Sequence, residues 1–244
     1  MRIKRQRNAM VFHASTLFWI FFVWGIAAPS PALCALADEG CDSFDVYAVD
    51  GSGEQVIHVA VRPNGNQAQI VQEGVIGMPG KPHGIAKNPA QSSLIVTLLG
   101  KGTESPRAVT LGIGNEGKHS IVGVADLQDS TGYTSFDRTG KYFLTSSYHD
   151  GHCDVYQVKS DGVVGDRVSH QQVAEKYAHS VLTTPDNKFL YVPCVKEFNA
   201  IYQYSFDEKT GGVEPLGPFD AKPPHMFGPR HIAYHPNLPY VYFS

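Results

Sequence analysis

A motif that recurs about every 48 residues is the feature of this 244-residue sequence that most restricts its fold. In each copy, a short semi-apolar stretch leads into a turn rich in Pro, Asp, Asn, Gly or Lys, and a strongly β-prone stretch follows. The four copies are residues 83–97, 131–145, 179–193 and 230–244. Their turn residues, Pro89, Asp137, Pro185 and Pro236, lie 48, 48 and 51 residues apart. The sequence therefore predicts a series of repeated β-rich units.

The third unit indicates how many strands each repeat contains. Its turn and second strand occupy residues 183–194, a third strand-like stretch follows at 200–207, and a fourth begins within 211–217. The Asp-Glu-Lys-Thr-Gly stretch between the last two is typical of a hairpin turn. Without a convincing helix, this pattern predicts an all-β fold, a β-propeller of four-stranded antiparallel blades. A solenoid of β-arches would need shorter repeats with ladders of Gly or Asn, which this sequence lacks.

The first 37 residues have the pattern of a signal peptide. Four Arg or Lys residues within the first seven precede an almost uninterrupted apolar run at 11–28, and Ala-Leu-Ala at 35–37 is a small-x-small cleavage motif. We therefore expect cleavage after Ala37 and export to the periplasm or the cell exterior. An uncleaved signal anchor is the alternative, because the apolar run is almost long enough to span a bilayer.

The charge balance restricts the partners. Removing residues 1–37 leaves 16 basic and 23 acidic residues, so the net charge changes from −3 to −7. An acidic chain without a basic cluster argues against nucleic acid as a partner, and no membrane contact is expected beyond the leader. The remaining cysteines, Cys41, Cys153 and Cys194, lack metal-type or redox-type spacing and are expected to be buried apolar residues.

Residues 38–244 amount to about four blades of this length. The stretches 44–49 and 56–62 resemble the later strands of a blade, and the last copy of the motif stops after its second strand. Two arrangements fit this pattern: a four-bladed ring closed by the terminal pieces, or a larger propeller of which this chain is an incomplete part. The β-rich run at 239–244 favours the incomplete propeller, because open blade edges are normally covered.

The repeat register also predicts a site. Six residues before the successive turn residues stand His83, Thr131, His179 and Arg230. If the strand before the turn is innermost, these positions converge at the mouth of the central channel. An imidazole can act as a general base, and a guanidinium can bind a carboxylate, a phosphate or an oxyanion. Histidines that are only structural are the alternative for each position taken alone.

Two further motifs are weighed and set aside. Residues 112–117 match Gly-x-Gly-x-x-Gly, but a β-branched strand pattern follows them instead of a helix, so we expect a glycine-rich hairpin. Residues 148–154 combine two His, two Asp and a Cys, which are metal-ligand types. They lie between the second and third strands of a blade, where Asp-Gly forms a turn, so we expect neither a metal nor any other cofactor.

The segments YAHSVLTTPDNKFLYVPCVKEFNAIYQYSFDEKTG and GPRHIAYHPNLPYVYFS resemble the bacterial lactonase family of seven-bladed propellers. Propeller-type 6-phosphogluconolactonase typifies that family, and the fungal 3-carboxymuconate lactonising enzyme is related to it. The segment YTSFDRTGKYFLTSSYHDGHCDVYQV fits the preceding blade, so that the resemblance extends over about 42–244. The resemblance implies a seven-bladed propeller of which about four blades are present here, truncated at the C-terminus.

The resemblance also implies roles for individual residues. The family's motif histidine falls on His179 and its motif arginine on Arg230, with His83, Tyr177 and His231 as further substrate-binding candidates. The family continues the last motif with an Asn-Glu pair, which would directly follow Ser244, and a further basic residue belongs to a later blade. The carboxylate of that pair lines the same site, so we expect impaired activity in this chain.

The implied reaction is hydrolysis of a sugar-derived lactone: His179, assisted by that carboxylate, activates water, and Arg230 binds an anionic group or the oxyanion. The partner implied is a small-molecule lactone, and the complete protein is expected to be monomeric. A lactonising cycloisomerase would use the same residue types. A non-catalytic propeller that serves as a binding scaffold, as in YVTN-like surface repeats, is the alternative from another class.

Overall fold

The computed structural model describes residues 44–64, 67–100, 104–114, 118–221 and 227–244. The predicted signal peptide, residues 1–37, lies outside these ranges, as does Cys41. The described chain contains β-strands and no helix, and the strands form successive antiparallel sheets. The all-β prediction is therefore confirmed.

Three of the sheets have four strands each, in the order of the chain. Their strands are β4 (Pro82–Lys87), β5 (Ser93–Leu98), β6 (Arg107–Ile113) and β7 (His119–Asp126), then β8 (Tyr133–Phe136), β9 (Tyr142–Ser146), β10 (His152–Val158) and β11 (Val164–Gln172), then β12 (Leu182–Thr183), β13 (Phe189–Cys194), β14 (Ala200–Phe206) and β15 (Val213–Ala221). Such meanders are propeller blades.

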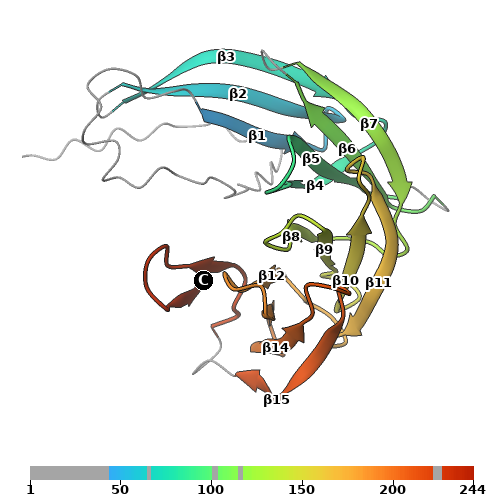
Figure 1. Cartoon of the computed structure of the whole chain (residues 1–244), viewed down its shortest axis with the longest axis vertical. Helices are drawn as coiled ribbons and strands as arrows, with labels where there is room; N and C mark the ends of the chain where they lie inside the picture. The colour runs from blue at the N-terminus through green and yellow to red at the C-terminus, as the bar shows by residue number, and fades with distance from the viewer. Residues whose placement is uncertain (1–43, 65–66, 101–103, 115–117, 222–226) are drawn as a thin grey trace, which may run out of the picture.

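A partial sheet flanks the three complete blades on each side. The first contains β1 (Phe44–Asp50), β2 (Gln55–Asn64) and β3 (Gln67–Gly77), and the last contains β16 (Ile232–Tyr234) and β17 (Val241–Phe243). The five sheets follow one another along an arc, with β1–β3 and β16–β17 at its two ends (Figure 1).

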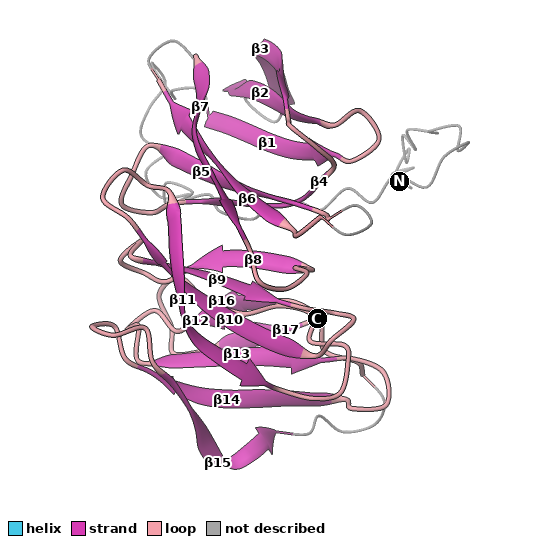
Figure 2. Ribbon diagram, turned by 90° about the vertical axis from the view of Figure 1, so that its right-hand side faces the viewer, coloured by secondary structure: helices cyan, strands magenta, loops and turns pink. Residues whose placement is uncertain are grey.

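The first strand of each complete blade is the innermost. Strand β8 packs against both β4 and β12 on the inner side, whereas β11 packs against β7 and β15 on the outer side. Figures 1 and 2 show the same order, with β7, β11 and β15 on the convex side of the arc. The prediction that the strand before each turn residue lies nearest the axis is confirmed.

A recurrent irregularity assigns the strands of the first sheet. In the complete blades, the pairing register shifts between the third and fourth strands, at Thr110/Leu111, at Val155/Tyr156 and near Tyr202. The same kind of shift lies between β2 and β3, at Ala60/Val61. Strands β1, β2 and β3 therefore correspond to the second, third and fourth strands of a blade, as their sequences predict.

The hydrophobic cores lie between neighbouring sheets. On β9, Leu144 belongs to the core shared with the next blade, whereas Phe143 faces the core shared with the preceding one. On β5, Ile95 faces the core shared with the next blade, and Val96 faces the core shared with the preceding sheet. Successive strand residues point to opposite faces, so a strand covered on both sides is apolar at every position. This burial explains the continuous β-prone runs of the repeat.

Turns occur in both the Gly-x-Gly-x-x-Gly region and the stretch 148–154, the last three residues of which begin β10. The β6–β7 hairpin includes a hydrogen bond from the Gly114 amide to the Lys118 carbonyl (2.7 Å), although residues 115–117 lie outside the described ranges. Between β9 and β10, Gly151 has a φ of 66°, in the left-handed region that favours glycine. Cys153 and Cys194 are buried free thiols, as expected.

Candidate functional site

The candidate site lies where the inner strands begin. His83 is in β4, Tyr133 is the first residue of β8, and Arg230 and His231 directly precede β16. His179 precedes β12, and its amide donates a hydrogen bond to the Pro193 carbonyl (2.9 Å). This hydrogen bond extends the inner strand of that blade back to His179.

We call the group of side chains at this position the entrance cluster. It consists of His83, Tyr133, Tyr148, His149, Tyr177, His179, Lys196, Arg230 and His231. It contains five of the six residues that the sequence predicts for the site, and Thr131 is the exception.

A pair of histidines is at the centre of the entrance cluster. The rings of His179 and His231 meet edge to face, with centroids 4.9 Å apart. The Tyr148 ring lies 5.9 Å from that of His179, and the Tyr133 ring lies 6.5 Å from that of His231. Sequence segments more than 50 residues apart are thus brought into one group by the blade repeat.

Arg230 reaches this group through its backbone as well as its charge. Its carbonyl accepts a hydrogen bond from the buried Ser180 hydroxyl (2.7 Å), which joins the last sheet to the blade of His179. The Arg230 side chain is exposed. Within the described residues its guanidinium has no ion pair, so it is available to an anionic ligand.

A cation held over two aromatic rings borders the histidine pair. The Lys196 ammonium lies 4.2 Å from the Tyr177 ring centroid and 5.6 Å from that of Tyr148. Tyr177 and Lys196 both have positive φ values, 71° and 57°. The Tyr177 amide donates to the Tyr148 carbonyl (2.7 Å), which fixes the two rings 5.0 Å apart.

His83 joins the entrance cluster from the neighbouring blade. Burial, and then the positive charges of Lys81 and His149, lower the pKa of His83. The ring of His149 lies 5.7 Å from that of Tyr148. His83 is therefore linked electrostatically to the same group, on the side away from Arg230.

One position of the predicted ring is wrong. Thr131 shares the register of His83, His179 and Arg230, but its side chain is buried (4% exposed). Tyr133, two residues further on, supplies the ring that contacts His231. Gly132, and not Thr131, is the structural equivalent of His179 and Arg230, because all three amides donate a hydrogen bond to a carbonyl at the end of the second strand, at Ser146, Pro193 and Ser244.

The electrostatics of the entrance cluster keep His179 neutral. Burial, and then the positive charges of His231 and Arg230, lower the pKa of His179 to about 4. The pKa of His231 is also lowered, by burial and by Arg230. Nδ1 of His179 is buried without a hydrogen-bond partner among the described residues. The imidazole can therefore accept a proton at neutral pH, beside groups that attract an anion.

Sequence reasoning missed Tyr133, Tyr148, His149 and Lys196 as members of the site. The last three lie between the second and third strands of a blade, outside the repeated motif. Tyr148 and His149 belong to residues 148–154, which combine metal-ligand residue types with a predicted turn. The Lys-Glu-Phe-Asn turn after β13 was a possible signal, because it occupies the equivalent position in the next blade.

The fold and the cluster together define the class: a β-propeller with a His- and Arg-containing cluster where its inner strands begin. Residues 46–244 match the family described as "Lactonase, 7-bladed beta-propeller". The chain therefore belongs to the lactonase family of seven-bladed β-propellers.

Curated relatives have similar sequences over most of the chain. The 6-phosphogluconolactonase of Erwinia tasmaniensis is 30% identical over 197 residues, which cover 81% of this chain and 57% of that protein. The 6-phosphogluconolactonase of Pectobacterium carotovorum is 28% identical over 198 residues, 78% of this chain and 57% of that protein. The chain thus spans a little over half the length of these relatives.

Solved structures share the fold. The periplasmic gluconolactonase PpgL of Pseudomonas aeruginosa superposes with a TM-score of 0.68 at 19% identity, over 83% of this chain and 61% of that one. A putative 6-phosphogluconolactonase of Bacteroides fragilis gives 0.67 at 13% identity, over 84% and 62%. Within the described ranges, no helix is long and apolar enough to cross a membrane.

Proposed function

We propose that the protein containing this chain hydrolyses a lactone of a sugar acid at the entrance cluster. The observation that carries the proposal is the neutral imidazole of His179, 4.9 Å from the His231 ring and under the positive charge of Arg230. Relatives that cover most of the chain are named 6-phosphogluconolactonase, which supports the same reaction class.

In the proposed reaction, His179 accepts a proton from a water molecule whose oxygen attacks the lactone carbonyl. Arg230 stabilises the oxyanion of the tetrahedral intermediate or binds an anionic substituent of the substrate. The bond between the carbonyl carbon and the ring oxygen then breaks. The proton passes from His179 to the ring oxygen, so lactone and water become a hydroxy acid without a cofactor.

A carboxylate beside His179 would make this imidazole a stronger base, because a negative charge raises the pKa of a histidine. None of the described carboxylates is hydrogen-bonded or ion-paired to His179. The sequence resemblance puts the family's Asn-Glu pair directly after Ser244. The Ser244 carbonyl accepts a hydrogen bond from the Arg230 amide (2.7 Å), so residues following Ser244 would continue beside the cluster.

The positive groups of the cluster favour an anionic lactone. Arg230, Lys196 and Lys81 lie around the histidines, and a phosphate or carboxylate on the substrate would be attracted to them. The predicted leader instead favours an unphosphorylated sugar lactone as the available substrate in an exported protein. We propose export, with a monomeric protein and no partner other than this small molecule.

The test uses the protein extended through the remaining blades of the family. Hydrolysis of a sugar δ-lactone, with and without a phosphate group, is followed in a pH-stat for wild type, His179→Gln and Arg230→Ala. His235→Gln is the matched control, because His235 lies in the β16–β17 turn. We expect both cluster variants to lose most of the rate, and wild-type rates in both would refute the site.

A binding propeller is the second candidate, favoured by one observation. The Tyr148–Tyr177–Lys196 group is a preformed platform for an anionic ligand and needs no carboxylate partner. Binding of a sugar-acid anion without turnover of its lactone, in the extended protein, would support this function. A cycloisomerase would be distinguished by product analysis, because it closes a lactone ring on an unsaturated dicarboxylate.

A further inference from the structure

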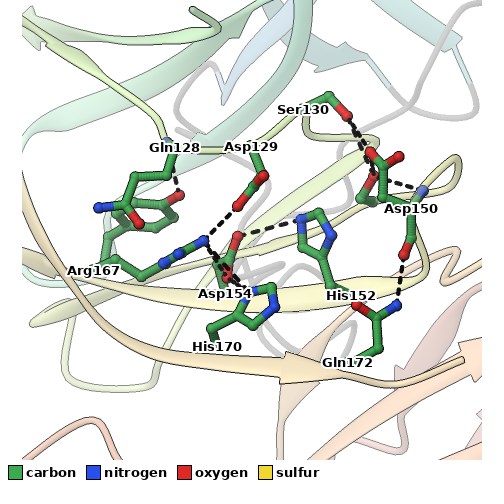
Figure 3. Close-up of polar contacts among 11 residues, drawn as sticks. Gln128, Asp129, Ser130, Asp150, His152, Asp154, Arg167, His170 and Gln172 are labelled. Carbon is green, nitrogen blue, oxygen red and sulfur yellow. Dashed lines mark hydrogen bonds and ion pairs between the residues drawn. The ribbon is translucent and has the colours of Figure 1, made fainter.

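A second polar cluster lies on the two outer strands of the middle blade, β10 and β11 (Figure 3). We call it the Asp154 cluster; it consists of Asp129, His152, Asp154, Arg167 and His170. Strand β10 contributes His152 and Asp154, which point to the same face because they are two residues apart. Strand β11 contributes Arg167 and His170, and Asp129 comes from the segment between β7 and β8.

Two buried atoms of this cluster lack hydrogen-bond partners. His152 is 3% exposed and Asp154 1% exposed, and His152 Nε2 lies 3.3 Å from Asp154 Oδ2. That distance allows an ion pair if the histidine is protonated, but the two atoms are not aligned for a hydrogen bond. Unsatisfied polar atoms are costly in a protein interior. Their juxtaposition requires an explanation that the lactonase site does not supply.

We propose that Asp129, His152 and Asp154 bind a divalent transition-metal ion such as zinc. One ligand atom from each residue lies within 4.8 Å of the others. Zinc bonds of about 2.0–2.1 Å place two ligands of a tetrahedron about 3.3–3.4 Å apart, which is close to the 3.3 Å between His152 Nε2 and Asp154 Oδ2. One imidazole with two carboxylates suits zinc, manganese or iron better than calcium or magnesium.

The surroundings hold the proposed ligands in position. Asp154 Oδ1 accepts a hydrogen bond from His170 Nδ1 (2.6 Å) and one from the Arg167 guanidinium (3.3 Å), which leaves Oδ2 directed at His152. Such hydrogen bonds to the second oxygen of a ligand are typical of metal sites. Burial raises the pKa of Asp154, but the contacts with His152 and His170 and the charge of Arg167 outweigh burial, so the carboxylate is ionised.

Arg167 also limits the affinity of this site. Its guanidinium contacts the carboxylates of both Asp129 and Asp154, so a cation already partly neutralises them. A bound metal would have to share Asp129 with it. We therefore expect micromolar rather than picomolar binding, and a role in joining the Asp129 segment to strands β10 and β11.

The test is a titration of the purified chain with cobalt(II), whose visible absorption reports direct coordination by nitrogen and oxygen ligands. We expect one equivalent to bind, and zinc to displace it. Asp129→Asn should weaken binding at least tenfold, and His152→Gln should abolish it. Asp129 is the decisive variant, because its side chain is 40% exposed and its replacement does not disturb the buried pair.

Two control variants make the result specific. His235→Gln should bind cobalt like wild type, because His235 lies in a surface turn. His179→Gln should also leave binding unchanged. Unaltered binding in Asp129→Asn, or a loss that occurs only in His179→Gln, would overturn the proposal by placing the ion elsewhere. The absence of a cobalt spectrum at millimolar metal would overturn it as well.

Discussion

His179 and His152 show how differently the two polar clusters use the same residue type. Burial lowers the pKa of both side chains. Beside His179 the charged neighbours are His231 and Arg230, and its pKa falls to about 4. Beside His152, close contact with the charged Asp154 carboxylate, with the charges of Asp129 and Asp150, outweighs burial and raises the pKa. The neighbours, more than the degree of burial, decide the protonation state.

The contrast extends to the ligands that each cluster suits. The entrance cluster combines a neutral imidazole with cationic side chains and therefore attracts anions. The Asp154 cluster contains two carboxylates and therefore attracts cations, with Arg167 as its internal partner. The same fold thus carries two clusters of opposite charge preference. Substitutions in either cluster therefore test this contrast.

The largest effect is expected from Asp154→Ala. It leaves Arg167 and the buried His152 without their shared carboxylate, and removal of one partner from a buried ion pair typically costs about 3–5 kcal/mol. Urea unfolding of the chain measures the change in the free energy of unfolding. Asp161→Ala is the matched control, because this exposed carboxylate accepts only a local turn hydrogen bond from the Val163 amide. Equal stability of both variants would show that the cluster is not a structural unit.

The next effect concerns activity in the extended protein. Removal of a single group that stabilises an oxyanion typically lowers turnover by about 10²–10³-fold. We expect Arg230→Ala to lose activity on this scale, and Arg230→Lys to recover part of it, because a charge remains without the bidentate geometry. Initial rates at saturating lactone measure this. A loss confined to KM would instead assign Arg230 to substrate binding alone.

The pH dependence of stability should have opposite signs for the two histidines. The folded-state pKa of His179 lies below its unfolded value of about 6.5, so the unfolded chain takes up the proton first as pH falls. His179 therefore destabilises the chain progressively between about pH 6.5 and pH 4, by up to about 2–3 kcal/mol. Unfolding free energies of wild type and His179→Gln should accordingly converge or cross as the solution is acidified.

For His152 the sign is reversed. Its folded-state pKa lies above the unfolded value, so its contribution is fully present below about pH 6.5 and is lost as pH rises through the folded pKa. The difference between wild type and His152→Gln should therefore shrink on going from pH 6 to pH 9. Urea titrations at several pH values measure both differences. A parallel pH dependence of the two variants would contradict the comparison.

The smallest effect is expected from Ser180→Ala. The Ser180 hydroxyl is buried and donates to the Arg230 carbonyl, and such a hydrogen bond contributes about 1 kcal/mol. Because it joins the last sheet to the blade of His179, its loss should raise hydrogen exchange of β16 and β17 selectively. Unchanged exchange there would show that other contacts position Arg230.

Much of the fold could be predicted because its signals are local. The turn residues fix where first and second strands meet, but the predicted register holds only in part: Leu94 and Leu190 are the second residues of β5 and β13, whereas Tyr142 is the first residue of β9. The same register brought His179 and Arg230 together. It was wrong at Thr131, because strand pairing makes the next residue, Gly132, the equivalent of His179 and Arg230, a one-residue shift that the spacing of the turn residues does not reveal.

The remaining site residues depend on contacts that no spacing reveals. Lys196 lies over Tyr148 and Tyr177 only because two residues adopt positive φ values in loops outside the repeat. The stretch 148–154 displays metal-ligand types, but Asp129 and Arg167 come from other segments. Only the pairing of β10 with β11 shows that Asp154 and His170 are direct neighbours.

The placement of the cores between sheets has a consequence for how the molecule resists force and heat. Among the described residues, β4–β7 and β8–β11 each contribute to two hydrophobic cores, β1–β3 and β12–β15 to one each, and β16–β17 to none of the three. Protection against local opening should therefore decline from the middle blade toward both ends of the arc, as in a linear array. The entrance cluster draws its Arg230 from an end sheet and its His179 from an internal blade. Its assembly is thus coupled to fraying of the arc, and any partner that covers β16–β17 would also tighten the site.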